Sequence, residues 1–176
     1  VQDGRGASKL FTAGFPVDTL LMADDTGDNW QLKDRLRGQK DLATNSTATE
    51  TDNTFYYFDD QTGLVTSSGG GSAIAQLTGY MWKRARGYFD VVTYDGTSST
   101  QNITHNLGVV PEMMWIKSRA NANSWIVYHK DQGATKRAFL HNTQAFDTAG
   151  AGIFNNTEPT ATQFTVATDS NTNSSG

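Results

Sequence analysis

Short apolar runs separated by polar turns recur along this chain. Three of them lie in the stretch 87–142, at residues 89–94, 113–116 and 125–128, and consist mainly of Val, Ile, Phe, Tyr, Met and Trp. β-Branched and aromatic side chains suit the pleated, half-buried surface of a sheet. Turn-forming residues such as Asp95-Gly96 separate the runs. The pattern predicts a β-meander.

The same pattern predicts strands in the rest of the chain, although the segment 30–36 has a short helix as an alternative. Residues 142–159 are expected to form a long loop, and residues 169–176 a turn-rich tail. Together these features predict an all-β fold of two related antiparallel β-sandwich-like repeats in tandem, residues 1–86 and 87–176. The remaining predicted strands are 9–11, 18–23, 55–58, 64–66, 80–82, 137–140 and 163–167.

The repeat is indicated by an ordered set of matches at an offset of about 95 residues. The matches include Pro16 with Pro111, Trp30 with Trp125, Gly38 with Gly133 and Lys40 with Lys136. Chance similarity between low-complexity β sequences is the alternative explanation. The first copy continues beyond Gly79 into the predicted strand 80–82, and the second copy has no counterpart of that strand before Gly176. We therefore expect the native polypeptide to continue past this residue with a final strand.

Composition argues against several classes of protein. The 176 residues carry a net charge of −4, which disfavours nucleic-acid binding, because phosphate contacts need clustered Lys and Arg. Cysteine is absent, so neither a disulfide nor a thiolate metal site can form. No apolar run approaches the ~20 residues of a membrane-spanning helix, so membrane insertion is not expected. The basic run of Lys83, Arg84 and Arg86 is expected to form a hinge between the copies.

Clustered acidic residues in one turn are the candidate for a metal site. Asp24, Asp25 and Asp28 lie close together in the sequence, and Ca²⁺ prefers carboxylate oxygens. The spacing departs from an EF-hand, since its glycine is missing and Arg35 stands where the bidentate Glu belongs. A plain β-turn explains the same residues. The aspartates are therefore a weak Ca²⁺ candidate, and no cofactor is expected.

No arrangement of catalytic residues emerges from the sequence. His105, His129 and His141 are dispersed and would bind a metal only if the fold brought them together. The nucleophile-elbow motif GxSxG is absent, and the stretch SSGGGS at 67–72 lacks the lysine of a phosphate-binding loop. We therefore predict no catalytic residue, and a protein that is not an enzyme.

Aromatic side chains are the candidate binding residues. Trp30 and Trp125 occupy equivalent places, and they would serve either as platforms for sugar rings or as repeated core residues. Tyr56, Tyr57 and Tyr128 are expected at an exposed contact surface, where an amphipathic ring loses little rotamer entropy on binding.

Six stretches of the second half form a distinctive set: GYFDVVTYDGT (87–97), HNLGVVPEMMWIKSR (105–119), NSWIVYH (123–129), GATK (133–136), IFNNTEPTATQFTV (153–166) and NSSG (173–176). Together they resemble a domain of unknown function found in structural proteins of marine tailed phages. The first half resembles the partner copy that often precedes this domain, through GFPVD (14–18), DRLRG (34–38) and GYMWK (79–83).

The resemblance implies a protein of the phage virion. In such phage proteins the copies often follow a concanavalin A-like lectin domain, which implies a tail-fibre or virion-surface component that contacts the host. We therefore expect a non-enzymatic virion structural protein that acts in host adhesion or virion assembly. Its expected partners are other virion proteins, further copies of itself in a homo-oligomer, with a trimer favoured, and a host surface glycan. A carbohydrate-binding module of a secreted bacterial protein is the alternative.

Overall fold

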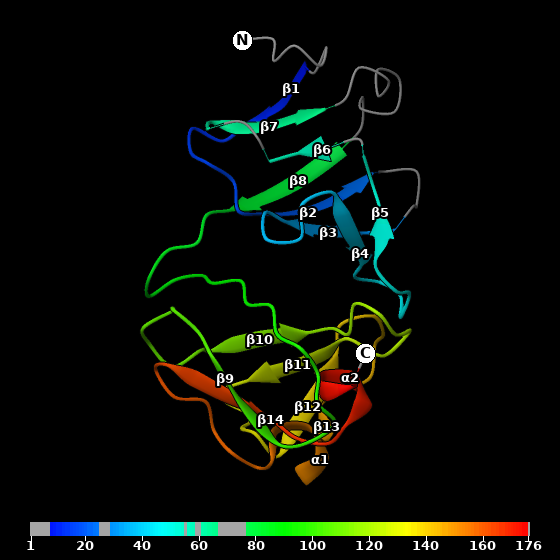
Figure 1. Ribbon diagram of the computed structural model, residues 1–176, viewed down its shortest axis with the longest axis vertical. Helices are drawn as coiled ribbons and strands as arrows, with labels where there is room; N and C mark the ends of the chain where they lie inside the picture. The colour runs from blue at the N-terminus through cyan, green and yellow to red at the C-terminus, as the bar shows by residue number, and fades with distance from the viewer. Residues whose placement is uncertain (1–7, 25–28, 55, 59–60, 67–76, 176) are drawn as a thin grey trace. The chain divides into compact units, whose positions relative to one another are not determined.

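The structure is a computed structural model that describes residues 8–24, 29–54, 56–58, 61–66 and 77–175 (Figure 1). These residues form fourteen strands and two four-residue helices, and the pairings between the strands are antiparallel. The all-β fold predicted from the sequence is confirmed. In the described part of the chain, no helix is long and apolar enough to cross a membrane.

The chain divides into two compact units. Unit 1 comprises Val1–Ala43 and Glu50–Arg84, and unit 2 comprises Thr44–Thr49 and Ala85–Gly176. The main boundary therefore falls within the basic run, between Arg84 and Ala85. The division into residues 1–86 and 87–176 that the sequence predicts differs from this arrangement mainly in the assignment of Thr44–Thr49.

Unit 1 contains two antiparallel sheets. The larger has the strand order β5 (Thr51–Asp52), β4 (Lys40–Ala43), β3 (Gln31–Asp34), β2 (Thr19–Asp24) and β8 (Leu77–Trp82). The smaller has the order β1 (Ser8–Thr12), β7 (Gly63–Thr66) and β6 (Tyr56–Tyr57). Within the larger sheet, β2 has β3 on one side and β8 on the other, so a strand from far along the chain closes this end of the sheet.

The core of unit 1 takes side chains from both sheets. Leu20 and Met22 alternate along β2 and are buried, whereas Leu21 between them is less buried. They belong to one cluster with Phe58 and with Leu64 of β7. Alternation of this kind is expected where one face of a strand packs on a core and the other does not. Unit 1 is therefore β-sandwich-like.

Unit 2 also contains two antiparallel sheets, together with both helices (Figure 1). The larger sheet has the order β10 (Met113–Ile116), β11 (Ile126–His129), β12 (Lys136–Phe139) and β13 (Asp147–Thr148). The smaller pairs β9 (Gln101–Thr104) with β14 (Gln163–Val166). The helices are α1 (Ala151–Phe154) and α2 (Ser170–Asn173).

Helix α1 is held in place by its packing into the core of unit 2. Its N-cap Gly150 makes no side-chain cap, and a single helical turn is not stable by itself. Ile153 and Phe154 are buried from this turn and join Ile126 of β11 and Phe164 of β14 in one cluster. Tertiary packing therefore stabilises the turn.

Two sequence-based expectations were wrong in unit 2. Residues 89–94 were expected to form a strand, yet only an isolated bridge between Ala85 and Phe89 is present there. Val92 and Tyr94 instead pack against the core without joining a sheet ladder, and the Tyr94 hydroxyl donates to the carbonyl of Thr172. β-Propensity reports how a side chain packs, so it does not distinguish a strand from an extended core segment. The expected loop at 142–159 contains β13 and α1.

The tail is also more ordered than its turn-rich sequence suggested. Helix α2 begins after Asp169, whose carboxylate accepts from the backbone N–H of Asn171. Asn173 is buried, and its amide nitrogen donates to the carbonyls of Ser99 and Ala167. Its amide oxygen accepts from the backbone N–H of Thr97 at 2.9 Å. This one side chain ties the tail to the segment that leads into β9.

A glycine beside the tail provides a test of this contact. A Cβ at Gly96 would lie 1.9 Å from the carbonyl oxygen of Ser174, so Gly96→Ala forces the backbone of one segment to move. We expect Gly96→Ala to lower the free energy of unfolding by about 1–3 kcal/mol, as overpacking does. Gly152→Ala in α1 is the control, because its Cβ would meet only ordinary contacts of 3.7 Å or more. It should be neutral or raise stability by up to about 1 kcal/mol. Urea unfolding of both variants measures the difference.

Candidate functional site

A buried ion pair lies inside unit 1. Lys33 of β3 opposes Leu20 across the sheet, and opposing residues share a face, so its side chain lies on the core side. Its Nζ donates to Oδ2 of Asp41 on β4 at 3.1 Å, and the two side chains are 1% and 7% exposed. Two charges so removed from water are tolerated only when they are paired and hydrogen-bonded.

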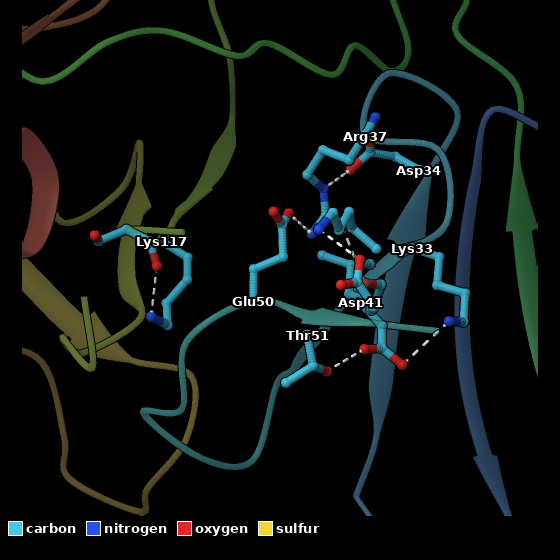
Figure 2. Close-up of polar contacts among 11 residues, drawn as sticks. Lys33, Asp34, Arg37, Asp41, Glu50, Thr51 and Lys117 are labelled. Atoms are coloured by element: carbon cyan, nitrogen blue, oxygen red, sulfur yellow. Dashed lines mark hydrogen bonds and ion pairs between the residues drawn. The ribbon is translucent and has the colours of Figure 1, made fainter. Parts of the chain in front are cut away.

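The carboxylate of Asp41 is fully engaged (Figure 2). The Thr51 hydroxyl donates to Oδ1 at 2.6 Å, and the side-chain amide of Asn53 donates to Oδ2 at 2.8 Å. Burial by itself would raise the pKa of Asp41, but these hydrogen bonds and the charge of Lys33 outweigh it and lower that pKa. Burial also lowers the pKa of Lys33, against the opposing effect of Asp41. We conclude that Asp41 is held as a carboxylate.

A second buried charge cluster braces the turn after β3. The Arg37 guanidinium contacts the Asp34 carboxylate through Nε and Glu50 through a nitrogen 3.1 Å from Oε1 (Figure 2). It also donates to the carbonyl of Leu32 at 3.0 Å. Asp34 in turn accepts from the backbone N–H of Arg37. The conspicuous DRLRG segment of the sequence therefore forms an internal brace.

Unit 2 contains a smaller polar arrangement around Tyr128. The Tyr128 hydroxyl donates to Oε2 of Glu158 at 2.7 Å, and the backbone N–H of Ala134 donates to Oε1 at 2.7 Å. Burial and the neighbouring carboxylate raise the pKa of Tyr128. The ring packs edge-on against Phe154 in the core. Glu158 therefore anchors the loop before β14 to the larger sheet.

Lys117, directly after β10, has an unusual amine. Its Nζ donates to the carbonyls of Ser118 at 2.6 Å and Asn121 at 3.0 Å (Figure 2). No carboxylate is among these partners, and burial lowers the pKa of Lys117 to about 8. Burial and the charge of Lys117 also lower the pKa of His141. Sequence reasoning missed this lysine, although a lysine that ends an apolar strand is the available signal.

Three aromatic rings form a row on unit 1. Trp30 stacks on Tyr80, and Tyr80 stacks on Trp82, with ring centroids 6.3 Å apart in each pair and interplanar angles of 18° and 24°. Trp30 is 39% exposed and Tyr80 is 49% exposed. Tyr80 and Trp82 are two residues apart on β8, so they share a face of the sheet. The sequence pointed to Trp30 but not to its two partners.

The predicted binding residues separate into different environments. Trp125 and Tyr128 are each 2% exposed, so neither ring face is available to a ligand, and the expectation of an exposed Tyr128 was wrong. Tyr128 belongs to β11 and Trp125 directly precedes this strand, and both side chains are buried inside unit 2. Tyr57 is half-buried on β6. The backbone of Tyr56 belongs to β6, but its side chain lies outside the described structure.

The predicted metal ligands are not brought together. Asp25 and Asp28 lie outside the described residues, and Asp24 is described only as the last residue of β2. His105 contacts the carbonyl of Thr160, and His129 lies 3.9 Å from an oxygen of Asp131. Among the residues that the structure describes, no group of three His, Cys, Asp or Glu side chains is placed to hold a metal ion.

Arg84 and Arg86 of the basic run each contact a residue of their own unit. Arg84 donates its backbone N–H to Asp18 at 2.8 Å, and its guanidinium lies 3.8 Å from the same carboxylate. The Arg86 side chain lies against Gly108, where a Cβ would come 2.7 Å from Nε. The side chains of Lys83, Arg84 and Arg86 are exposed.

The fold and these sites define an all-β protein in which the buried charged groups Lys33, Asp34 and Asp41 are engaged in internal bracing. The chain belongs to the family described as Domain of unknown function (DUF7483), whose model matches residues 70–176. The match includes the whole stretch in which the second half resembles a domain of unknown function. Searches of curated proteins and of solved structures gave no match to this chain.

Removing the counter-charge of Lys33 tests the buried pair. We expect Asp41→Asn to lower the free energy of unfolding by about 3–5 kcal/mol, because it leaves a buried ammonium without its carboxylate. The control is Asp52→Asn, which breaks the exposed pair with Lys40 and should cost less than about 1 kcal/mol. Equal losses in the two variants, measured by urea unfolding, would contradict a special role for the buried pair.

The pH dependence of stability gives an independent test of Asp41. Its pKa in the folded protein lies below the ordinary value of 3.8. The stabilisation is therefore complete above that pH and is lost as the pH falls through the lower, folded-state pKa. Thermal unfolding between pH 2 and 7 should show a shallower acid loss in Asp41→Asn than in the original chain. Parallel curves would show that Asp41 does not titrate as described.

The amine of Lys117 should titrate near neutrality. NMR of the lysine Cε resonances should give a midpoint near pH 8 for Lys117, because burial disfavours its charged form. Lys130 is the control, since its hydrogen bond with Glu112 raises its pKa above 10.5. A midpoint for Lys117 close to that of an exposed lysine would rule out this description of its surroundings.

Proposed function

We propose that this chain is a non-enzymatic structural protein of a bacteriophage virion, a tail-fibre or capsid-surface component built from two copies of one β unit. The observation that carries the proposal is the correspondence between the strand ladders of the two units. The sequence resemblance to structural proteins of tailed phages supplies the biological setting.

The larger sheets of the two units run in the same order. β2, β3, β4 and β5 are consecutive neighbours in unit 1, as β10, β11, β12 and β13 are in unit 2. The corresponding cross-strand pairs are Leu20–Lys33 with Met114–Tyr128, Leu32–Leu42 with Val127–Ala138, and Lys40–Asp52 with Lys136–Thr148. Unrelated β units have no reason to share both order and register, so this agreement supports duplication of one unit.

The turns and smaller sheets agree in the same way. β1 pairs with β7 as β9 pairs with β14, and both pairings are antiparallel. Gly14 and Gly108 share a φ of +77°, a conformation that favours glycine. Gly38 and Gly133, matched by sequence, have φ of +68° and +74°. The proposed repeat therefore extends beyond the larger sheet to the residues that turn the chain.

A building role suits the chemistry of the polar clusters. The carboxylates of Asp41, Asp34 and Glu158 are bonded to donors within their own unit. Carboxylates committed in this way stabilise a fold and are poorly placed to exchange protons with a substrate. As a virion component, the protein would act through many copies on one particle, whose weak contacts with a host surface glycan add up to high avidity. Its proposed partners are other virion proteins and further copies of this chain, with a trimer favoured.

Particle composition and native mass test the proposal together. Antibodies raised against the chain should label the tails or surface of phage particles produced from the genome that encodes it, and the native protein should have the mass of a trimer or larger ring. Absence of the chain from purified particles would contradict the virion assignment. A native protein that stays monomeric at micromolar concentration would contradict the assembly role.

A carbohydrate-binding module is the second candidate, and the row of Trp30, Tyr80 and Trp82 favours it. Exposed aromatic rings on a sheet face can stack on sugar rings. Glycan-array binding should then be lost in Trp30→Ala and Tyr80→Ala. Trp115→Ala, which removes a similarly exposed indole from unit 2, serves as the control. An original chain that binds no glycan would exclude this candidate.

A further inference from the structure

Two side-chain nitrogens of unit 1 donate to the same carboxylate oxygen. Nζ of Lys33 lies 3.1 Å from Oδ2 of Asp41, and the side-chain amide nitrogen of Asn53 lies 2.8 Å from the same atom. Because they share one acceptor, the two nitrogens lie within about 6 Å of each other. An amine, a carboxyl group and a carboxamide therefore meet around one oxygen atom.

The strand ladder places these three groups on one face of the larger sheet. Continuing the register of β3 with β4 brings Lys33 opposite Asp41, and Thr51 of β5 opposes Asp41 on the other side. Asn53 is two residues beyond Thr51, and its backbone N–H donates to the carbonyl of Gln39, directly before β4, at 2.9 Å. Opposing residues, and residues two apart along a strand, share a face. Backbone pairing therefore determines that the three side chains meet.

The amine of this group is shielded from water. The side chains of Lys33 and Asp41 are 1% and 7% exposed, and burial lowers the pKa of Lys33 by disfavouring its ammonium form. A desolvated lysine amine is a nucleophile, and a carboxamide is an electrophile that it can attack when the two are held together. The interior of unit 1 thus holds a nucleophile beside its electrophile.

Asp41 is positioned to move protons between the two nitrogens. A general acid–base group acts within about 2.6–3.2 Å of the atoms that lose and gain the proton. Oδ2 of Asp41 meets this condition at Lys33 and at Asn53. The Thr51 hydroxyl donates to the other oxygen, Oδ1, at 2.6 Å and so fixes the orientation of the carboxylate (Figure 2). The carboxyl group therefore lies between a nucleophile and its leaving group.

We propose that Lys33 attacks the side chain of Asn53 and forms an amide crosslink inside unit 1, with Asp41 as the acid–base group. Rotation of the Asn53 side chain turns Cγ toward Nζ of Lys33, the Nζ–Cγ bond forms, and the bond from Cγ to the amide nitrogen breaks. Two protons pass from Nζ through Asp41 to the departing nitrogen, which leaves as ammonium. The charge is conserved, and the step needs neither an oxidant nor a cofactor. The buried ion pair is the state before this reaction.

The crosslink ties β3 to the segment after β5 across β4. It closes a loop of about 20 residues, so the unfolded chain loses conformational entropy and the folded sheet gains stability. Because the acid and both reacting groups belong to one chain, the reaction occurs once and acts on no external substrate. The inference goes beyond the proposed function and does not depend on a virion role.

The intact mass of the protein measures the bond directly. Residues 1–176 are purified, incubated folded at pH 8 and then weighed by mass spectrometry in denaturant. We expect about 17 Da less than the mass of the sequence, because each bond releases one ammonia. Peptide mapping should show one branched tryptic peptide that joins Lys33 to Asn53. A chain that keeps its full mass overturns the proposal. A loss of about 18 Da with Lys33 joined to Asp41 also overturns it, since water is then the leaving group.

Two variants remove the reacting groups, and a third is the matched control. Lys33→Arg removes the nucleophile and Asn53→Ala removes the electrophile, so both should keep the full mass of their sequences. Lys40→Arg changes an exposed lysine of the neighbouring strand and should lose ammonia as the original chain does. A loss that persists in Lys33→Arg overturns the proposal, because cyclisation of an asparagine onto its own backbone also releases ammonia. Circular dichroism checks that each variant folds, and the peptide map of the original chain decides the question where one does not.

Discussion

One antiparallel pair in the larger sheet of each unit, β2 with β3 and β10 with β11, determines where the other groups lie. Opposing residues share a face, so a shift of one residue would exchange core and outer side chains. The register that buries Leu20 also brings Lys33 to the core side, where its ammonium needs Asp41. Unit 2 has Tyr128 in the matching place, and its hydroxyl needs Glu158. In each unit, a carboxylate thus accepts a hydrogen bond from a polar side chain that the register of the strands places in the interior.

Each unit contains polar side chains that make several internal hydrogen bonds or ion pairs. Asn173 donates two hydrogen bonds from its amide nitrogen and accepts at its oxygen, and Arg37 contacts two carboxylates and a carbonyl. Groups engaged in this way rigidify a fold, because moving one partner leaves another buried and unpaired. Such rigidity suits the structural role proposed above. The amine of Lys117 stands apart, since carbonyls and not a carboxylate surround it.

The edges of the larger sheets distinguish the two units. The outer edge of β2 is covered by β8, and the outer edge of β10 exposes Met113 and Trp115. Under the assembly role proposed above, an open edge would serve as a specific attachment point with a defined direction. Backbone hydrogen bonds would supply affinity at that edge, and the alternating side chains would supply specificity. Folding and assembly would then rest on the same ladder geometry.

The sequence by itself determined the all-β class, most of the strands and the matching order of Trp, Gly and Lys in the two halves, because period-2 apolar patterns and turn residues act locally. It did not distinguish the ladder strands from residues 89–94, which have strand-like side chains but pack without pairing. It also did not decide whether Trp125 is a platform for sugar rings or a residue of the core. Only the tertiary structure buried Trp125 and Tyr128, stacked Trp30 with Tyr80 and Trp82, and placed Lys33 against Asp41. Burial and long-range pairing decide those outcomes, and they depend on residues far apart in the chain.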